Sequence, residues 1–108
     1  MNTIQLEKTT IISDFDNNLE KIAIQLTNLN FENQNIILDL SDKIGLKPKN
    51  LNVFLNISKS INTNKNSFVI VVSDFDFNKA PTKINVVPSI QEAYDIIEME
   101  DIERDLGF

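Results

Sequence analysis

The residues that most often carry catalysis are missing from this chain. It contains no histidine and no cysteine, so the commonest general base and the thiolate nucleophile are unavailable. The best carboxylate pair is Asp74 and Asp76 in SDFDF, which follows an apolar run, and Asp39 lies near the end of another such run. Oxygen ligands at the carboxyl ends of parallel strands could hold Mg²⁺. We interpret both aspartates as loop residues that alternate with inward-turned Phe75 and Phe77, and we predict no catalytic residue, metal or cofactor.

Three lysines form the best candidate for an anion site. Lys43, Lys47 and Lys49 flank Pro48, where a helix is expected to begin, and the first turn of a helix favours anions. With only two glycines in the chain, however, a glycine-rich phosphate loop cannot form. We therefore interpret the lysines first as solvated or interface residues. An anion or small-ligand site at this helix start is the second hypothesis.

Composition limits the classes of function further. The 108 residues fit one domain, and 42% of them are hydrophobic, enough for a core without disulfides or structural zinc. The net charge of −6 argues against general nucleic-acid binding, which needs a surplus of basic residues. No apolar run approaches the ~20 residues that span a bilayer, and the first residues do not resemble a signal peptide. We expect a cytoplasmic protein with no membrane and no nucleic-acid partner.

Patterns of apolar residues predict alternating strands and helices. Residues 3–12 indicate one or two strands broken near Lys8, and residues 16–29 a helix capped by Asp14 or Asp16. The apolar runs NIILDLS (35–41) and SFVIVV (67–72) are typical of strands buried on both faces, as in a parallel sheet. The remaining expected elements are a helix from Pro48 with a broad apolar arc, a short strand at 83–87, and a helix that begins with the capping box SIQE at residues 89–92.

The last helix carries two apolar stripes on opposite sides. Ile90, Ala93, Tyr94 and Ile97 form one stripe; Met99, Ile102 and Leu106 form the other, and Phe108 follows. One helix cannot bury both sides against one sheet. The chain therefore breaks near Glu98 and folds back, or the second stripe contacts another chain, or the acidic tail frays.

Charge is unevenly distributed along the chain. Residues 42–66 hold five lysines against one aspartate, and residues 95–108 hold six acidic residues against one arginine. Opposite charges attract, so the acidic segment 95–108 favours contact with a basic surface. Met99, Ile102, Leu106 and Phe108 are therefore our candidate partner-binding residues. Lys43, Lys47 and Lys49 of a second copy are a possible complement, and the partner is otherwise unknown.

At LDLSDKIGLKPKNLNVFL the chain resembles the STAS family, named for sulphate transporters and anti-sigma-factor antagonists. Leu38 to Ser41 match its strand, and Leu51, Phe54 and Leu55 match the apolar start of its helix. The resemblance covers roughly residues 1–98 and implies an α/β fold that docks protein partners. The family's phosphorylated Asp-Ser-Ser-Gly motif is replaced here by residues 47–50 (KPKN), so its serine switch is not implied.

The closing segment DIIEMEDIERDLGF is similar to the end of a group of short bacterial proteins sometimes labelled ribonuclease Z. That label names a nuclease that holds two zinc ions with histidine-rich motifs, which a chain without histidine cannot supply. The similarity therefore implies at most an accessory protein associated with that enzyme.

These observations together predict a STAS-like α/β domain at residues 1–98, with residues 99–108 as an acidic amphipathic segment of the same domain. The sheet should be mixed and largely parallel, with four to five strands and flanking helices. The expected function is that of a regulatory protein-interaction module that is not an enzyme.

Overall fold

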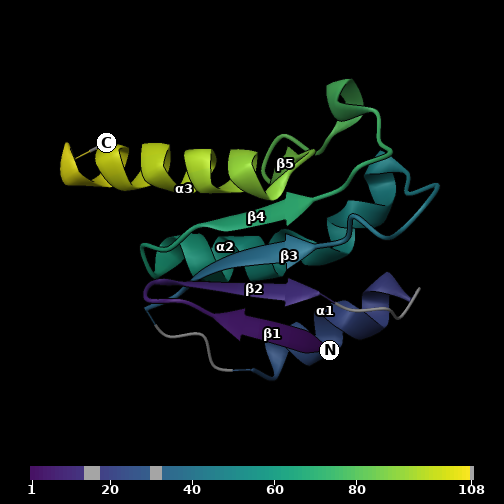
Figure 1. Ribbon diagram of the computed structural model, residues 1–108, viewed down its shortest axis with the longest axis horizontal. Helices are drawn as coiled ribbons and strands as arrows, with labels where there is room; N and C mark the ends of the chain where they lie inside the picture. Colours follow the sequence, from purple (N-terminus) through teal and green to yellow (C-terminus); the bar gives the residue numbers. More distant parts are fainter. Residues whose placement is uncertain (14–17, 30–32, 108) are drawn as a thin grey trace.

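The computed structural model describes residues 1–13, 18–29 and 33–107. In chain order, its elements are β1 (Asn2–Gln5), β2 (Thr9–Ser13), α1 (Leu19–Thr27), β3 (Asn35–Asp39), the 3₁₀ helix η1 (Pro48–Phe54), α2 (Leu55–Thr63), β4 (Phe68–Val71), the 3₁₀ helix η2 (Phe77–Lys79), β5 (Asn85–Val87) and α3 (Ile90–Asp105). The strands form one sheet in the order β1-β2-β3-β4-β5 (Figure 1). The predicted α/β class is confirmed.

Four of the five strands are parallel. β2, β3, β4 and β5 pair in parallel, and β1 pairs with β2 in antiparallel fashion. The two long apolar runs form the internal strands β3 and β4, as predicted. A strand that is buried on both faces has no solvent-facing side on which polar residues would alternate with apolar ones. The break expected near Lys8 separates β1 from β2.

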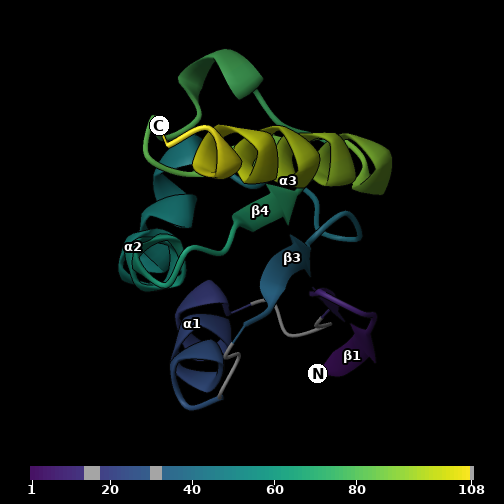
Figure 2. The ribbon, with the colours of Figure 1, turned by 90° about the vertical axis from the view of Figure 1, so that its left-hand side faces the viewer.

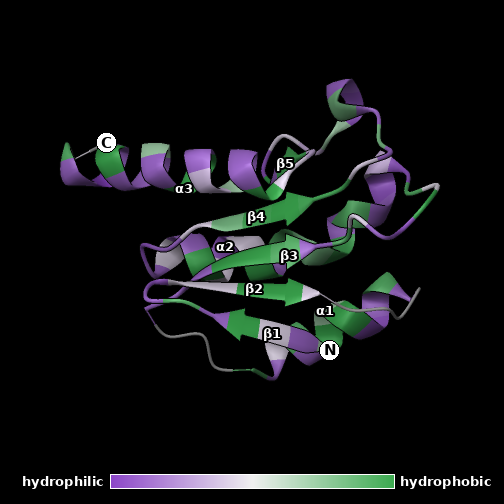
Figure 3. Cartoon of the chain, in the orientation of Figure 1, coloured by the Kyte–Doolittle hydropathy of each residue, from purple (hydrophilic) through white to green (hydrophobic). Residues whose placement is uncertain are grey.

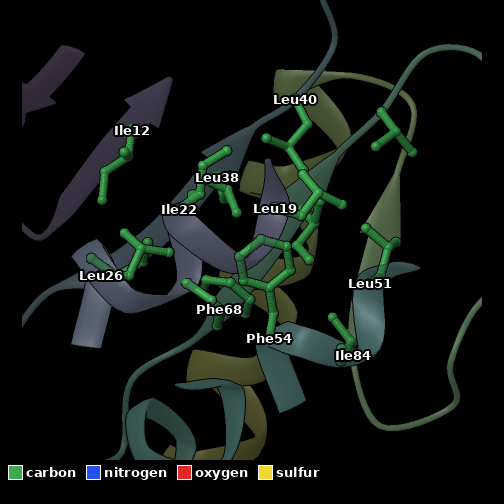
Figure 4. Close-up of a cluster of buried hydrophobic side chains, with 14 residues drawn as sticks. Ile12, Leu19, Ile22, Leu26, Leu38, Leu40, Leu51, Phe54, Phe68 and Ile84 are labelled. Carbon is green, nitrogen blue, oxygen red and sulfur yellow. The ribbon is translucent and has the colours of Figure 1, made fainter. Parts of the chain in front are cut away.

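One face of the sheet is covered by α1, η1 and α2 (Figure 2). Leu19, Ile22 and Leu26 of α1 and Leu51 and Phe54 of η1 pack against the side chains of alternate strand residues. The Phe54 ring lies beside Phe68 of β4, with 6.3 Å between ring centroids, near the middle of this cluster (Figure 4). This is the main core of the protein.

The helix expected from Pro48 begins as a 3₁₀ helix instead of an α-helix. Residues three apart lie on the same side of a 3₁₀ helix, so Leu51 and Phe54 both face the sheet and are fully buried. The α-helical turn takes over at Leu55, where Ile57 and Ile61 are only partly buried. The broad apolar arc is therefore accommodated by a change of helix type.

Helix α3 covers the opposite face. Ala93 and Ile97 pack against Ile37 of β3 and against Val69 and Val71 of β4. The Ser89 half of the predicted capping box is present, because the Ser89 hydroxyl accepts a hydrogen bond of 3.2 Å from the Glu92 N–H. The cap of α1 differs from the prediction: Asn18 supplies it through its side-chain oxygen, and Asp14 and Asp16 lie outside the described residues.

Candidate functional site

The inner side of α3 changes character along its length. Its first half is apolar, with Ala93 and Ile97 buried in the second core. Its second half is polar: Glu100 Oε2 accepts a 3.0 Å hydrogen bond from the Asn85 side chain, and Arg104 donates a 3.1 Å bond to the Ser67 hydroxyl. These bonds attach the C-terminal turns of α3 to β5 and to the start of β4. No pattern in the sequence indicates this polar attachment.

The outer side of α3 presents the second apolar stripe to solvent. Met99, Ile102 and Leu106 are 49%, 53% and 67% exposed. Asp95, Glu98 and Glu103 are exposed beside them. We call Met99, Ile102 and Leu106 the outer stripe and these three acids its acidic rim. Along α3, hydrophobic and hydrophilic colours alternate over the whole helix, whereas β4 and the middle of β3 are hydrophobic (Figure 3).

The continuity of α3 bears on two of the alternatives for the C-terminal segment, a break near Glu98 and fraying. The helix passes through Glu98 without a break and ends at Asp105, so the segment neither folds back nor frays there. Its last turns extend beyond the start of β4 (Figure 1). Gly107 follows in the left-handed region at φ +82°, a common helix ending. Phe108, the fourth predicted contact residue, lies outside the described residues.

The three predicted basic contact residues do not form one surface. Lys47 and Lys49 are exposed at the start of η1, as expected. Lys43 is buried at 6% exposure, and its Nζ lies 3.9 Å from Asp42 Oδ1. The prediction of Lys43 as a solvated or interface residue was therefore wrong. Its aliphatic stem lets the side chain pack along the protein, a property that a count of charges does not capture.

The start of η1 is also poorly suited to hold an anion. Pro48 has no N–H, and the Lys47 N–H donates to Asn50 Oδ1 at 2.9 Å. The open hollow beside Lys49 is lined in part by Glu20, whose carboxylate would repel an anion. The second hypothesis of the sequence analysis therefore gains no support from this geometry.

Two of the three candidate aspartates, Asp39 and Asp76, have structural roles. Asp39 Oδ1 accepts from the Ser41 N–H at 3.0 Å, and Asp76 caps η2 by accepting from the Asn78 N–H at 3.2 Å. Within the described residues, no three acidic side chains come together as a metal site would require. Phe75 packs against the main core as predicted, but Phe77 lies against Phe75 and stays 36% exposed, so its inward orientation was wrongly predicted.

A groove of about 270 Å³ lies between α1 and α2. It could not be predicted from the sequence, because it depends on how the two helices pack. Leu26, Ile57 and Ile61 contribute apolar surface, and Asn56 and Asn64 contribute amides. None of its lining residues is charged. This groove is more enclosed than the open hollow beside Lys49.

Comparisons with known proteins add no assignment to this geometry. No helix in the described ranges is both long and apolar enough to cross a membrane. No protein-family model matches the chain, and no curated protein matches it in sequence.

Proposed function

We propose that this chain is a non-catalytic, STAS-like protein-interaction module that binds a basic, partly apolar segment of another protein on the outer stripe of α3. The observation that carries the proposal is the continuous helix α3, which leaves Met99, Ile102 and Leu106 exposed at helical spacing. Three large apolar side chains on one exposed helix face are typical of a contact surface. Burying each could contribute about 1.5–3 kcal/mol before the ordering costs of association.

The acidic rim defines the chemistry of the partner. Glu98 and Glu103 lie on the two sides of the stripe, and Asp95 lies one turn before Met99. The inner-side Arg104 is engaged with Ser67 and Asp101. Two copies of α3 packed stripe to stripe would bring like charges together, so this surface disfavours its own copy. An amphipathic helix with apolar residues at i, i+3 and i+7 and with lysine or arginine on both sides would match both the stripe and the rim.

The STAS-like part of the proposal is supported by the element order. A strand, a helix, a strand and a second helix follow one another around the LDLS segment, with Leu51 and Phe54 buried as the resemblance implies. Pro48 occupies a position where the family has a serine, and a proline cannot be phosphorylated. The module that we propose therefore docks its partner without that switch. Ribonuclease Z is one candidate partner, from the resemblance of the last segment.

A defined peptide gives the first test. An NMR titration with a leucine-lysine amphipathic helical peptide should shift the amide signals of Met99, Ile102 and Leu106. A leucine-glutamate peptide of the same length should leave these signals in place, because the rim repels it. Ile102→Lys should abolish the response, whereas Ile24→Lys, at an isoleucine of α1 that is 63% exposed, should not. Equal shifts with both peptides, or shifts elsewhere on the molecule, would contradict the proposal.

The native partner requires a second measurement. A protein captured from the source cells supports the proposal only if Ile102→Lys loses it, Ile24→Lys keeps it, and salt weakens it. Purified ribonuclease Z from the same source can be tested directly with the same variants. Truncation after Ile97 is a less clear test, because it also removes the bonds that Glu100 and Arg104 make to the body of the protein.

A further inference from the structure

The two edges of the sheet are protected to different degrees. At one edge, β5 is short, is packed against α3, and lies between Pro81 and Pro88. At the other edge, all four residues of β1 are exposed, and Ile4 is 59% exposed. Figure 1 shows β1 as the outermost strand of the sheet. Among the described residues, β2 is the only strand that pairs with β1, so the outer edge of β1 is open to a further strand.

The sequence of β1 carries none of the features that usually keep an edge strand from pairing. Residues 1–6 (MNTIQL) contain no charged residue, no proline and no glycine. Natural edge strands are typically guarded by lysine, proline or a bulge. Charged residues make up 24% of the whole chain, so the lack of charged side chains in residues 1–6 is a local feature.

The hydrogen bonds of the hairpin show which backbone groups remain free. Leu6 donates its N–H to the Thr9 carbonyl at 2.8 Å, and the register pairs Ile4 with Ile11 and Asn2 with Ser13. Bonded and non-bonded pairs alternate in an antiparallel ladder, so the even-numbered residues bond toward β2. The N–H and C=O groups of Thr3 and Gln5 therefore point toward the open edge.

We propose that β1 pairs antiparallel with β1 of a second copy, so that two sheets join into one across a twofold axis. The axis is perpendicular to the sheet, so the face that α3 covers in one copy continues as the same face in the other. Side chains alternate between the two faces along a strand, so even-numbered residues must lie opposite even-numbered ones. The register centred on Ile4 meets this condition. It pairs Thr3 of each copy with Gln5 of the other through their outward backbone groups.

The side chains match in the same register. Ile4 lies opposite Ile4 of the second copy in a non-bonded pair, where Cα atoms approach to about 4.5 Å. Ile11 is its part-buried neighbour on the same face, so both copies together assemble four isoleucines. On the opposite face, Thr3 meets Gln5, which are both neutral and polar. At the three central positions, apolar residues meet apolar ones and polar residues meet polar ones, which is why a second copy fits this edge. The next pair outward places Asn2 opposite Leu6.

This contact is isologous and closes on itself, so it produces a dimer and cannot extend into a larger assembly. It leaves α3 free, because α3 packs on β3, β4 and β5, toward the opposite edge of the sheet from β1. The dimer is thus independent of the function proposed above.

Analytical ultracentrifugation of the full chain over a concentration series tests the dimer directly. We expect a monomer–dimer equilibrium, which Ile4→Lys weakens about a hundredfold because it removes the apolar pair and opposes two like charges. Gln5→Pro should also weaken it, since it removes an outward N–H that the isolated hairpin does not use. Ile24→Lys is the matched control, at an equally exposed isoleucine, and should leave the equilibrium unchanged. Ile102→Lys should also leave it unchanged, which separates the dimer from the α3 contact.

Disulfide trapping gives the register. The chain has no cysteine, so Ile4→Cys introduces a single thiol, and cysteines in this geometry fall within the range that a disulfide spans. Ile4→Cys should oxidise to a covalent dimer much faster than Ile24→Cys. A full chain that stays monomeric at every concentration, or equal cross-linking of the two cysteine variants, would overturn the proposal. A dimer that Ile4→Lys leaves intact would overturn it as well.

Discussion

Arg104, in the last turn of α3, donates a 3.1 Å hydrogen bond to the hydroxyl of Ser67, the residue that precedes β4. About two turns of helix separate Arg104 from the buried Ile97. Together with the bond from Asn85 to Glu100, this contact fixes the rotation of α3 about its own axis. Met99 and Ile102 must therefore point away from the sheet. The exposure of the outer stripe is a consequence of how the inner side is held.

We predict that Arg104→Ala loosens the end of α3 without unfolding the protein. It removes one part-buried hydrogen bond, which contributes about 1 kcal/mol, together with the contact to Asp101. Urea denaturation should show a loss of that size, and amide exchange should speed up between residues 99 and 105. Glu103→Ala, on the solvent side of the same turn, is the control and should change stability by less than about 0.5 kcal/mol. Equal effects of the two variants would show that the Ser67 bond does not hold the helix.

Truncating one isoleucine on each side of α3 should separate the two stripes. Ile97 is 6% exposed and packs in the second core, so Ile97→Ala should lower the free energy of unfolding by about 2–5 kcal/mol. Ile102 is 53% exposed, so Ile102→Ala should cost less than about 1 kcal/mol in the isolated chain. A large loss for Ile102→Ala in urea denaturation would mean that the outer stripe is buried in solution.

Elements whose signal is local could be predicted from the sequence. The apolar runs of β3 and β4 indicate burial on both faces, and the Ser89 cap depends on residues only three apart. The inner stripe of α3 follows from helical spacing in the same way. In each case, the residues that form the pattern are close together in sequence, and the pattern fits one type of secondary structure better than the others.

Features that depend on tertiary packing could not be predicted. The two stripes of α3 were equally compatible with a broken helix and with a straight one, because the deciding contact joins Arg104 to Ser67 across 37 residues. Burial of Lys43 depends on how its loop lies against the body of the protein, which its charge does not reveal. The groove between α1 and α2 is set by the angle and distance between helices, and no residue pattern encodes it directly.

The buried position of Lys43 leads to a stability prediction. Lys43→Ala should lower the free energy of unfolding by about 1–3 kcal/mol, because the packed stem of the side chain is lost. Lys43→Met keeps most of that stem and should cost less. Lys47→Ala is the control at an exposed lysine of the same segment and should be nearly neutral. If chemical denaturation gives Lys43→Ala and Lys47→Ala the same stability, Lys43 is not packed as described.

Asn35 provides a separate test of how the strands are joined. Its side-chain oxygen accepts a 2.8 Å hydrogen bond from the Ser67 N–H, and the residue is 4% exposed. Asn35→Ala should cost about 1–3 kcal/mol, because the Ser67 N–H is left buried without its acceptor. Asn56→Ala, at an exposed asparagine of α2, is the control. A neutral Asn35→Ala in thermal and urea unfolding would show that water replaces the side chain there.

The acidic rim predicts how binding on α3 depends on salt and charge. Rim charges act mainly on the encounter between partners, so neutralising Asp95, Glu98 and Glu103 to amides should slow association more than it speeds dissociation. Affinity of the wild type for the leucine-lysine peptide should fall as salt rises, and that slope should flatten in the triple amide variant. Ile102→Ala should have the opposite signature, with faster dissociation and an unchanged salt slope, because it removes apolar contact and no charge. Surface plasmon resonance at several salt concentrations measures both rates. A salt slope that the triple variant leaves unchanged would show that the rim does not face the bound peptide, even if the outer stripe does.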